Sequence, residues 1–188
     1  MSNILADLIS DYKATTLVEY DTAFKEVSQK IILLGLWRAK FFEHAAFYGG
    51  TALRLLYNLD RFSEDLDFSL LSQNRSFELK KYLTAVQTEM RAYGIESSVA
   101  MKQSPRTGNT ESAFVKADTQ ELLLVAGIPE SLRRMVPVGK LLRIKFEVDV
   151  DPPSGFLVEN KTILSPIPFS VNTYTLPDIF AGKMHAVL

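Results

Sequence analysis

The stretch FYGGTALRLLYNLDRFSEDLDFSLL, residues 47–71, constrains the fold more than any other part of the chain. A short apolar run ends at Gly49-Gly50, an amphipathic segment follows, and an Asp-x-Asp pair comes directly before another apolar run. Apolar and polar residues alternate from Leu66 to Leu70, which is the period of a strand. We therefore expect a glycine turn, a short helix that Thr51 caps and that runs to Leu59, and a strand over residues 66–70.

Asp65 and Asp67 lie two residues apart on this expected strand, so both carboxylates point to the same face, roughly 7 Å apart. Two such carboxylates repel each other, and a hard divalent cation such as Mg²⁺ neutralises them while it keeps coordination positions for water and phosphate oxygens. An ordinary charged strand face is the alternative interpretation, because an Asp-x-Asp pair alone is weak evidence for a metal site.

Gly49 and Gly50 come directly before the expected helix. Backbone N–H groups at the positive end of a helix bind phosphate, and glycines leave no side chain to block its approach. The alternative is that the two glycines only make a tight turn into the helix.

The clearest strand is LLRIKFEVDVD, residues 141–151, which places apolar side chains on one face and charged side chains on the other. Glu147 and Asp149 both lie on the charged face. If this strand pairs with the strand of Asp65 and Asp67, three carboxylates converge, which is enough for one or two metal ions. The alternative is an edge strand with a charged face on which Lys145 balances Glu147.

The rest of the chain predicts further helices and strands in mixed order. Helical periodicity covers about residues 15–46, with Trp37 expected in the core, and residues 79–93, which Gly94 ends. Strand-like runs cover about 95–101, 113–117, 122–125 and 169–174, a turn-rich loop covers 104–112, and a final helix begins after Thr175. Because there is no strict βαβ alternation, we expect an α/β (α+β) fold with a mixed β-sheet and flanking helices.

Composition limits the class of protein. The 188 residues are 47% hydrophobic and 23% charged, as in globular proteins, and the net charge of −1 gives no overall basic field for nucleic acid. A local basic stretch is a candidate RNA contact, with solvated surface charges as the alternative; it contains Arg133, Arg134, Lys140, Arg143 and Lys145. No cysteine, signal peptide or membrane-spanning segment is present, so we expect a cytoplasmic protein without a membrane partner.

Four motifs together resemble the AbiEii family of abortive-infection toxins, which are nucleotidyltransferases of the polymerase-β-like superfamily. They are Gly-Gly-Thr-Ala-Leu-Arg (49–54), Arg-Phe-Ser-Glu-Asp-Leu-Asp (61–67), Ile-Lys-Phe-Glu (144–147) and Leu-Pro-Asp-Ile-Phe-Ala-Gly-Lys (176–183). The resemblance implies a polymerase-β-like core. It also implies an enzyme of a toxin–antitoxin system that transfers a nucleotide from a nucleoside triphosphate to RNA, such as tRNA, releases pyrophosphate, and has a cognate antitoxin as partner.

The resemblance also implies roles for single residues. Gly49, Gly50 and Thr51 would form the triphosphate turn, with Ser63 near the phosphates and Lys183 as a phosphate clamp. Asp65, Asp67 and Glu147 would be the catalytic acids and the ligands of Mg²⁺, or of Mn²⁺ in its place, with Asp149 as the alternative third acid. Arg54 and Arg61 flank the expected site, where a guanidinium can neutralise phosphate, and an ordinary exposed arginine on a helix is the alternative interpretation. His44 and His185 are expected to be structural or solvated.

The chain also departs from the family pattern. The usual Gly-Ser of the superfamily is Gly-Gly-Thr here, so any hydroxyl role falls to Thr51 or Ser63. Family members usually continue past the lysine helix into an Arg-Asp-x-x-Asp segment and a helical domain. We therefore expect one nucleotidyltransferase domain over 1–188, with an N-terminal helical segment (1–46), a catalytic core sheet (47–175) and the start of a truncated helical region (176–188). The alternative function is a catalytically weak domain that binds an antitoxin or RNA.

Overall fold

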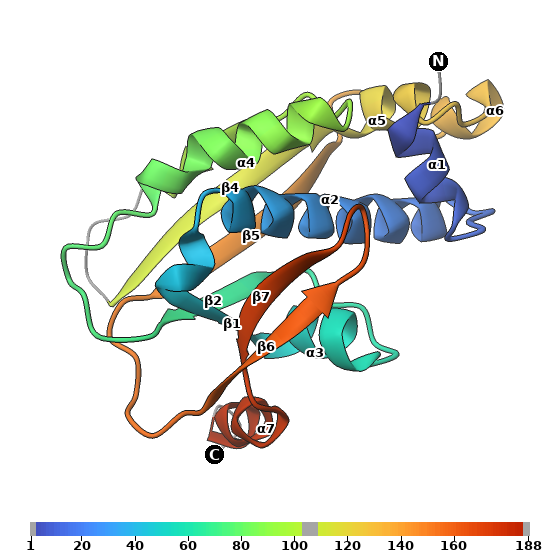
Figure 1. Cartoon of the computed structure of the whole chain (residues 1–188). Coiled ribbons are helices and arrows are strands. Elements are labelled where there is room, and N and C mark those ends of the chain that lie inside the picture. The colour runs from blue at the N-terminus through green and yellow to red at the C-terminus, as the bar shows by residue number, and fades with distance from the viewer. Residues whose placement is uncertain (1–2, 103–108, 186–188) are drawn as a thin grey trace.

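A computed structural model describes residues 3–102 and 109–185 of the chain. Seven strands form one mixed sheet in the order β3-β4-β5-β2-β1-β7-β6 (Figure 1). The strands are β1 (Ala45–Tyr48), β2 (Leu66–Leu70), β3 (Ser98–Met101), β4 (Thr110–Asp118), β5 (Leu141–Asp149), β6 (Val158–Ile163) and β7 (Phe169–Tyr174). The helices are α1 (Ile4–Ser10), α2 (Leu17–Arg38), α3 (Gly49–Tyr57), α4 (Lys80–Ala92), α5 (Thr119–Val125), α6 (Glu130–Arg133) and α7 (Leu176–His185), with a 3₁₀ turn η1 (Phe41–Glu43). The expected mixed sheet with flanking helices is confirmed.

The central strand β2 connects the two halves of the sheet. It pairs antiparallel with β1 and parallel with β5, so Asp67 lies opposite Tyr48 on one side and Glu147 on the other. Ser112 on β4 lies opposite Glu147 in turn. The Asp67 and Glu147 strands therefore pair, as the convergence of their carboxylates requires, and one row of polar side chains crosses four strands.

The opposite face of the sheet is apolar and packs under the long helices. α2 contacts α4, β5 and β7, and α2 and α4 run across the sheet (Figure 1). The buried rings of Phe41 and Phe68 meet edge to face with centroids 5.0 Å apart, and Phe47 lies 5.3 Å from Phe68. This aromatic cluster fixes β1 and β2 against the helical layer and leaves their polar face free for a site.

Helix α2 begins and ends through local contacts. Thr16 and Glu19 form a reciprocal capping box, and the hydrogen bonds from Thr15 and Thr16 lower the pKa of Glu19 to about 2. The helix ends at Arg38 because the backbone of Lys40 adopts a left-handed conformation, with φ of 62°. The predicted helix over 15–46 is therefore too long, and Ala45–Tyr48 form β1, so the expected border at residue 46 falls within a strand.

Other predicted elements also need correction. Thr51 does not cap α3, which begins at Gly49; it is buried within the helix. The predicted strand at 122–125 is helix α5, because Asp118 caps it by accepting a hydrogen bond from the Glu121 N–H, 3.0 Å away. Only residues 98–101 of the strand expected at 95–101 are a strand.

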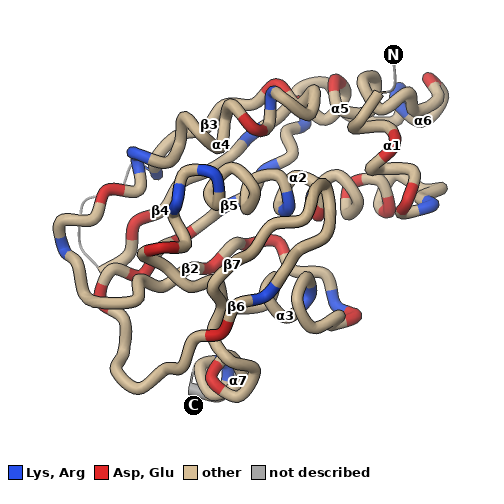
Figure 2. Tube along the Cα trace, viewed as in Figure 1, with Lys and Arg blue, Asp and Glu red and all other residues tan. Residues whose placement is uncertain are grey.

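Some predictions fall partly outside the described residues. Positions 104–108 of the expected loop at 104–112 are among these, whereas residues 110–112 belong to β4. The course of the last helix beyond residue 185 also lies outside them. Acidic and basic residues are interspersed over helices and strands (Figure 2). Within the described ranges, no helix combines the length and hydropathy that a membrane crossing requires.

Candidate active site

The glycine turn lies against the acidic strand. Gly49 has φ of 83°, a conformation that L-residues rarely adopt, and a Cβ there would come within 2.4 Å of the Asp67 Oδ2 atom. A Cβ on Gly50 would come within 2.5 Å of the Ser63 Oγ atom and 3.8 Å of the Lys183 Nζ atom. A side chain at either position would have to displace the side chain of Asp67 or Ser63, so the glycine turn lies in direct contact with both.

A cavity of about 330 Å³ lies at this turn. Residues far apart in the sequence line it. Helix α3 begins directly after β1, the loop after α3 leads into β2, and α7 contacts α3, so three segments of the chain meet here. Six predicted site residues are among its lining residues: Gly50, Arg61, Ser63, Asp65, Asp67 and Lys183. Leu59, Phe62 and Glu64 complete the lining. The structure thus brings these six residues to one cavity, whereas Gly49, Thr51 and Glu147 are not among the residues that line it.

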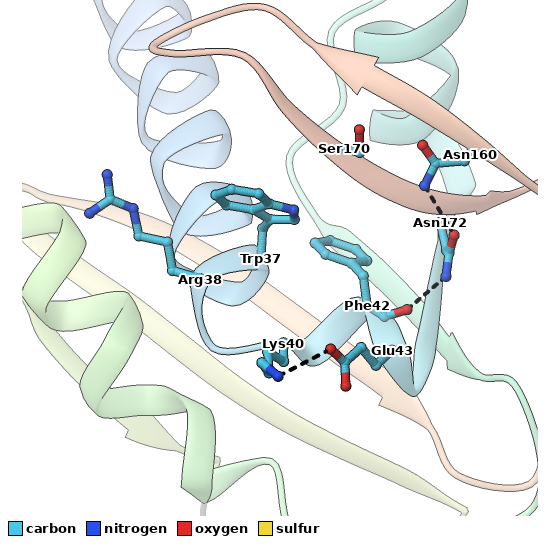
Figure 3. Close-up of a pocket in the computed structure, with 8 residues that line it drawn as sticks. All are labelled: Trp37, Arg38, Lys40, Phe42, Glu43, Asn160, Ser170 and Asn172. Carbon is cyan, nitrogen blue, oxygen red and sulfur yellow. Dashed lines mark hydrogen bonds and ion pairs between the residues drawn. The ribbon is translucent and has the colours of Figure 1, made fainter.

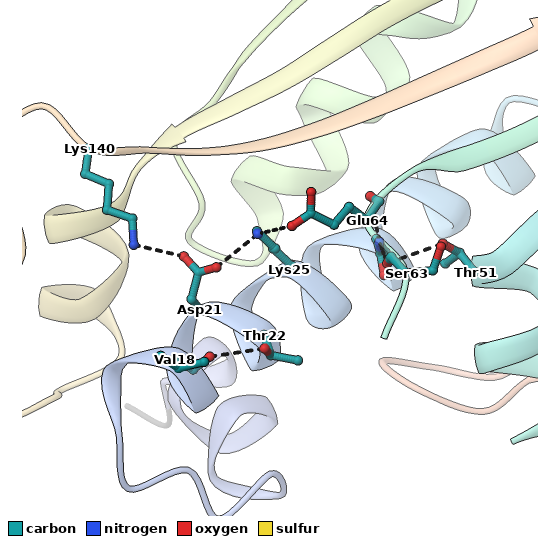
Figure 4. Close-up of polar contacts among 9 residues, drawn as sticks. Val18, Asp21, Thr22, Lys25, Thr51, Ser63, Glu64 and Lys140 are labelled. Carbon is teal, nitrogen blue, oxygen red and sulfur yellow. Dashed lines mark hydrogen bonds and ion pairs between the residues drawn. The ribbon is translucent and has the colours of Figure 1, made fainter. Parts of the chain in front are cut away.

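Buried polar side chains hold the loop that carries Ser63 and Asp65. The Gln29 amide on α2 donates hydrogen bonds to the carbonyl oxygens of Ser63, at 2.8 Å, and Glu64, at 3.0 Å. The Thr51 hydroxyl donates to the carbonyl oxygens of Asp65 and, at 3.4 Å, Ser63 (Figure 4). Because the Thr51 hydroxyl is used in this way, Ser63 is the hydroxyl that can face a ligand.

Ion pairs tether the same loop from outside. Lys25 on α2 lies 2.6 Å from the Glu64 carboxylate and 3.0 Å from that of Asp21 (Figure 4). Lys140 contacts the second oxygen of Asp21 at 3.3 Å. These contacts join α2, the loop before β2 and the turn before β5, so the position of Asp65 depends on α2.

The acids of the cavity carry uncompensated negative charge. Burial raises the pKa of Asp67 to about 6, the neighbouring Asp65 and Glu147 carboxylates add to the rise, and Lys145 and Lys183 partly offset it. Burial also raises the pKa of Asp65, again against the effect of Lys145. A divalent cation would remove this repulsion, and carboxylate oxygens are the ligands that Mg²⁺ prefers, so the residues present fit the expected metal.

Glu147 lies in register with Asp67 but is engaged by other partners. Its carboxylate accepts a hydrogen bond from Ser112, at 2.7 Å, and lies 2.7 Å from the Lys145 ammonium. Burial would raise the pKa of Glu147, but these two contacts outweigh it and lower the pKa. Within the described residues no group of three acidic or histidine side chains has metal-binding spacing. The metal-ligand role of Glu147 therefore stays a prediction that requires its release from Lys145.

Asp149, the alternative third acid, lies one pleat further along β5, opposite Ser69 of β2. Its carboxylate accepts a hydrogen bond from the Asp151 backbone N–H at 3.0 Å. Glu147 is thus the acid directly opposite Asp67, and Asp149 is displaced from it along the strand.

Other expected residues have different outcomes. Arg54 does not face the cavity, because it pairs with Glu26 at 3.0 Å and donates to the Leu59 carbonyl. Trp37 is not a core residue: 40% of its surface is exposed. His44 is exposed as expected, whereas the side chain of His185 lies outside the described residues.

The predicted basic stretch is largely paired within the chain. Lys140 contacts Asp21, Lys145 contacts Glu147, and Arg134 contacts Glu130 at 2.6 Å. Arg133 donates to a backbone carbonyl at 3.0 Å. Sequence reasoning also missed Gln29 of α2, which is fully buried. No local pattern in the sequence distinguishes it from the solvated residues nearby.

The fold is shared with solved structures from Helicobacter pylori. JHP933 is 18% identical, with a TM-score of 0.50 over 86% of this chain and 55% of that one. A second structure, of a proposed nucleotidyltransferase, is 19% identical, with a TM-score of 0.51 over 83% of this chain and 54% of that one. At this identity the likeness concerns the fold alone, and the present chain spans about half the length of these proteins.

The family follows from the sequence. The profile of the AbiEii family, described as nucleotidyl transferase AbiEii toxin of type IV toxin–antitoxin systems, matches residues 31–188. The chain therefore belongs to the AbiEii nucleotidyltransferase toxin family, which confirms the resemblance seen in its motifs. A search of curated proteins finds no match.

Proposed function

We propose that this protein is a metal-dependent nucleotidyltransferase, the toxin of a toxin–antitoxin system, which transfers a nucleotide from a nucleoside triphosphate to an RNA acceptor such as tRNA. One observation carries the proposal: a single cavity gathers Gly50, Ser63, Asp65, Asp67 and Lys183. Phosphate-binding and metal-binding groups from three separate segments meet there. The AbiEii family supports the same activity and an antitoxin partner.

The triphosphate would lie on the glycine turn. Gly49 and Gly50 open helix α3, so the turn offers free N–H groups without side chains, and the Ser63 hydroxyl adds a donor beside them. Lys183 enters from α7 and brings an ammonium to the same turn. Arg61, exposed at the cavity, adds a second cation for phosphate.

Asp65 and Asp67 would hold the divalent ion, Mg²⁺ or Mn²⁺. When bound, such an ion neutralises phosphate charge as a Lewis acid. The chain itself supplies the remaining functions. Lys183 stabilises the negative charge that develops on the departing pyrophosphate, and the row through Asp67 and Glu147 faces the incoming acceptor hydroxyl. Glu147, once released from Lys145, would accept the proton of that hydroxyl.

The open face of the sheet provides a path for an RNA backbone. Every second residue of β5 lies on the same face of the sheet, which places Arg143, Lys145 and Glu147 in one line. Lys116 of β4 lies directly opposite Arg143. This arrangement gives a basic strip that leads to Glu147, although Lys145 is paired with Glu147 in the ligand-free protein. Such cations bind phosphates without reading sequence.

Transfer of a radiolabelled nucleotide tests the proposal. Each of the four α-labelled ribonucleoside triphosphates would be incubated with bulk tRNA, Mg²⁺ and the protein. We expect labelled tRNA with the wild type and none with Asp67→Asn. Asp60→Asn is the matched control, because Asp60 is an exposed acid near the same loop that does not line the cavity.

Equal labelling by wild type and Asp67→Asn would refute the proposed catalytic site. The alternative function, a catalytically weak domain that binds an antitoxin or RNA, predicts a different result: no labelling by any variant, with triphosphate binding unaffected by Mg²⁺.

A further inference from the structure

A second cavity, of about 540 Å³, lies between the C-terminal end of α2 and the β6–β7 hairpin. None of the candidate active-site residues lines it. Trp37 and Phe42 come from α2 and η1, and Asn160, Ser170 and Asn172 from the two strands (Figure 3). Its volume falls in the range of pockets that take small organic ligands.

An exposed aromatic surface forms one wall of this cavity. Trp37 is 40% exposed, and its ring is held by Phe169, with centroids 6.1 Å apart. The rings of Trp37 and Phe42 lie on the helical side, opposite the polar side chains of the hairpin (Figure 3). A tryptophan ring that is fixed in place and yet open to solvent offers a flat surface on which another planar group can stack.

Side-chain amides face this aromatic wall. Asn160 donates its amide to the Asn172 Oδ1 atom at 3.2 Å, and Asn172 donates to the Phe42 carbonyl at 2.7 Å (Figure 3). This chain of hydrogen bonds runs in one direction and so orients both amides. An asparagine amide has two N–H donors and one acceptor oxygen, so the pair retains donors and an acceptor for a ligand. Proteins read the edges of unpaired bases with such groups.

Two cationic side chains, Arg38 and Lys40, line this cavity. The Lys40 side chain is 76% exposed and lies 3.6 Å from Glu43, a weak pair that a phosphate can displace. Arg38 points away from the Trp37 ring (Figure 3) and pairs with Glu89 at 3.4 Å. Lys40 is therefore the ammonium available for an anionic ligand here.

We propose that this cavity binds an unpaired nucleotide of a single-stranded RNA. Its base would stack on Trp37, its edge would contact Asn160 and Asn172, and its phosphate would lie near Lys40. This inference rests on the proposed function in that the acceptor is RNA. The flat ring of Trp37 matches the face of a base, the oriented amide pair matches its edge, and the Lys40 ammonium matches its phosphate. This combination favours a nucleotide over a peptide of a partner protein.

The fluorescence of Trp37 tests the inference in the unmodified protein, because the chain contains one tryptophan. Single-stranded tetraribonucleotides of each of the four bases would be titrated into the protein. We expect saturable quenching by at least one tetramer and none when the same sequence is in a duplex. Asp67→Asn should show the same quenching, because Asp67 does not line this cavity.

Two variants separate specific binding from general effects, with a labelled tetramer and fluorescence anisotropy as the readout. Trp37→Leu should weaken binding about 5- to 150-fold, the range that base–aromatic stacking carries. Asn160→Ala should weaken it about 2- to 12-fold, the value of a neutral hydrogen bond. The matched control is Thr162→Ala, an exposed residue on the same strand that does not line the cavity, and it should change nothing.

Absence of saturable quenching with all four tetramers would overturn the inference, as would equal binding by the Asn160→Ala and Thr162→Ala variants. Quenching by an antitoxin peptide instead of RNA would identify the other class of ligand and also overturn it. If the protein transfers a nucleotide but no tetramer quenches Trp37, the RNA-binding role of this cavity is wrong and the proposed function stands. If a tetramer quenches Trp37 but the protein transfers no nucleotide, the proposed function is wrong and the role of this cavity stands.

Discussion

Asp67→Asn should make the protein more stable while it abolishes nucleotide transfer. Burial and the carboxylates of Asp65 and Glu147 raise the pKa of Asp67 to about 6, against 3.8 for an ordinary aspartate. Each unit of this difference in pKa corresponds to about 1.4 kcal/mol in the free energy of unfolding. Ionised Asp67 therefore lowers the free energy of unfolding by on the order of 3 kcal/mol, and a neutral amide of the same shape removes that cost.

The sign of the pH dependence follows from the direction of the shift. Below about pH 4 the carboxyl is protonated in both the folded and unfolded states and costs nothing. Between about pH 4 and 6 the unfolded chain releases its proton first, so the stability of the wild type falls. Above about pH 6 the carboxyl is ionised in both states, and the full loss of unfolding free energy is present. The stability difference between Asp67→Asn and wild type should thus grow from near zero at pH 3.5 to about 3 kcal/mol at pH 7.5.

Urea unfolding at pH 3.5, 5 and 7.5 measures this difference, with Asp60→Asn as the control that should track the wild type. Saturating Mg²⁺ should then stabilise the wild type, by about 2.7 kcal/mol at one hundred times the dissociation constant, and leave Asp67→Asn unchanged. A variant that is no more stable than the wild type at pH 7.5 would show that the acids of this cavity do not repel each other as described.

Three further substitutions test individual contacts. Lys183→Ala should weaken binding of a triphosphate by about 1.5–3 kcal/mol, the value of a charge-assisted hydrogen bond. Calorimetry should show unchanged binding of the nucleoside, and equal losses for both ligands would contradict the phosphate role of Lys183. Gln29→Met leaves the Ser63 and Glu64 carbonyls without their donor, so the free energy of unfolding should fall by about 1–3 kcal/mol and triphosphate binding should weaken. Unchanged triphosphate binding would make Gln29 purely structural. Lys145→Met frees Glu147 from its ion pair, so the affinity for Mn²⁺ should increase about 1.5- to 5-fold. Electron paramagnetic resonance measures the bound Mn²⁺, and weaker binding would show that Lys145 does not compete with the metal.

The sequence predicted the parts of the fold that depend on local periodicity. β2, β5 and β7 follow from alternation over five or more residues, and α4 from its apolar stripe and the Gly94 stop. Residues 122–125 were mistaken for a strand because a run of four apolar residues shows no period, and the cap at Asp118 that makes them helical was overlooked. The helix expected over 15–46 includes the first two residues of β1, because no residue near Lys40 in the sequence indicates its left-handed backbone.

The sequence motifs point to several candidate residues that the structure brings together. Gly50, Ser63, Asp65, Asp67 and Lys183 were identified from motifs, and the structure gathers them at one cavity. Residues that act through tertiary contacts were not predictable. Gln29 reaches the loop of Ser63 from a helix more than thirty residues earlier in the chain. The hydrogen bond from Ser112 to Glu147 likewise depends on the pairing of β4 with β5, whereas the ion pair of Glu147 with Lys145, two residues away on the same strand, is the alternative that the sequence offered.

The order in which the chain leaves the ribosome determines when this cavity can first exist. Asp65 and Asp67 are translated about 120 residues before Lys183, which arrives on α7 and completes the cavity beside Gly50. At about 5–20 residues per second, this separation corresponds to roughly 6–24 seconds of synthesis. A nascent chain therefore carries its acids and glycine turn without the lysine for most of that time. On the proposed function, no nucleotide transfer is expected before Lys183 has been translated, and an antitoxin that recognises the earlier segments would have that interval in which to bind.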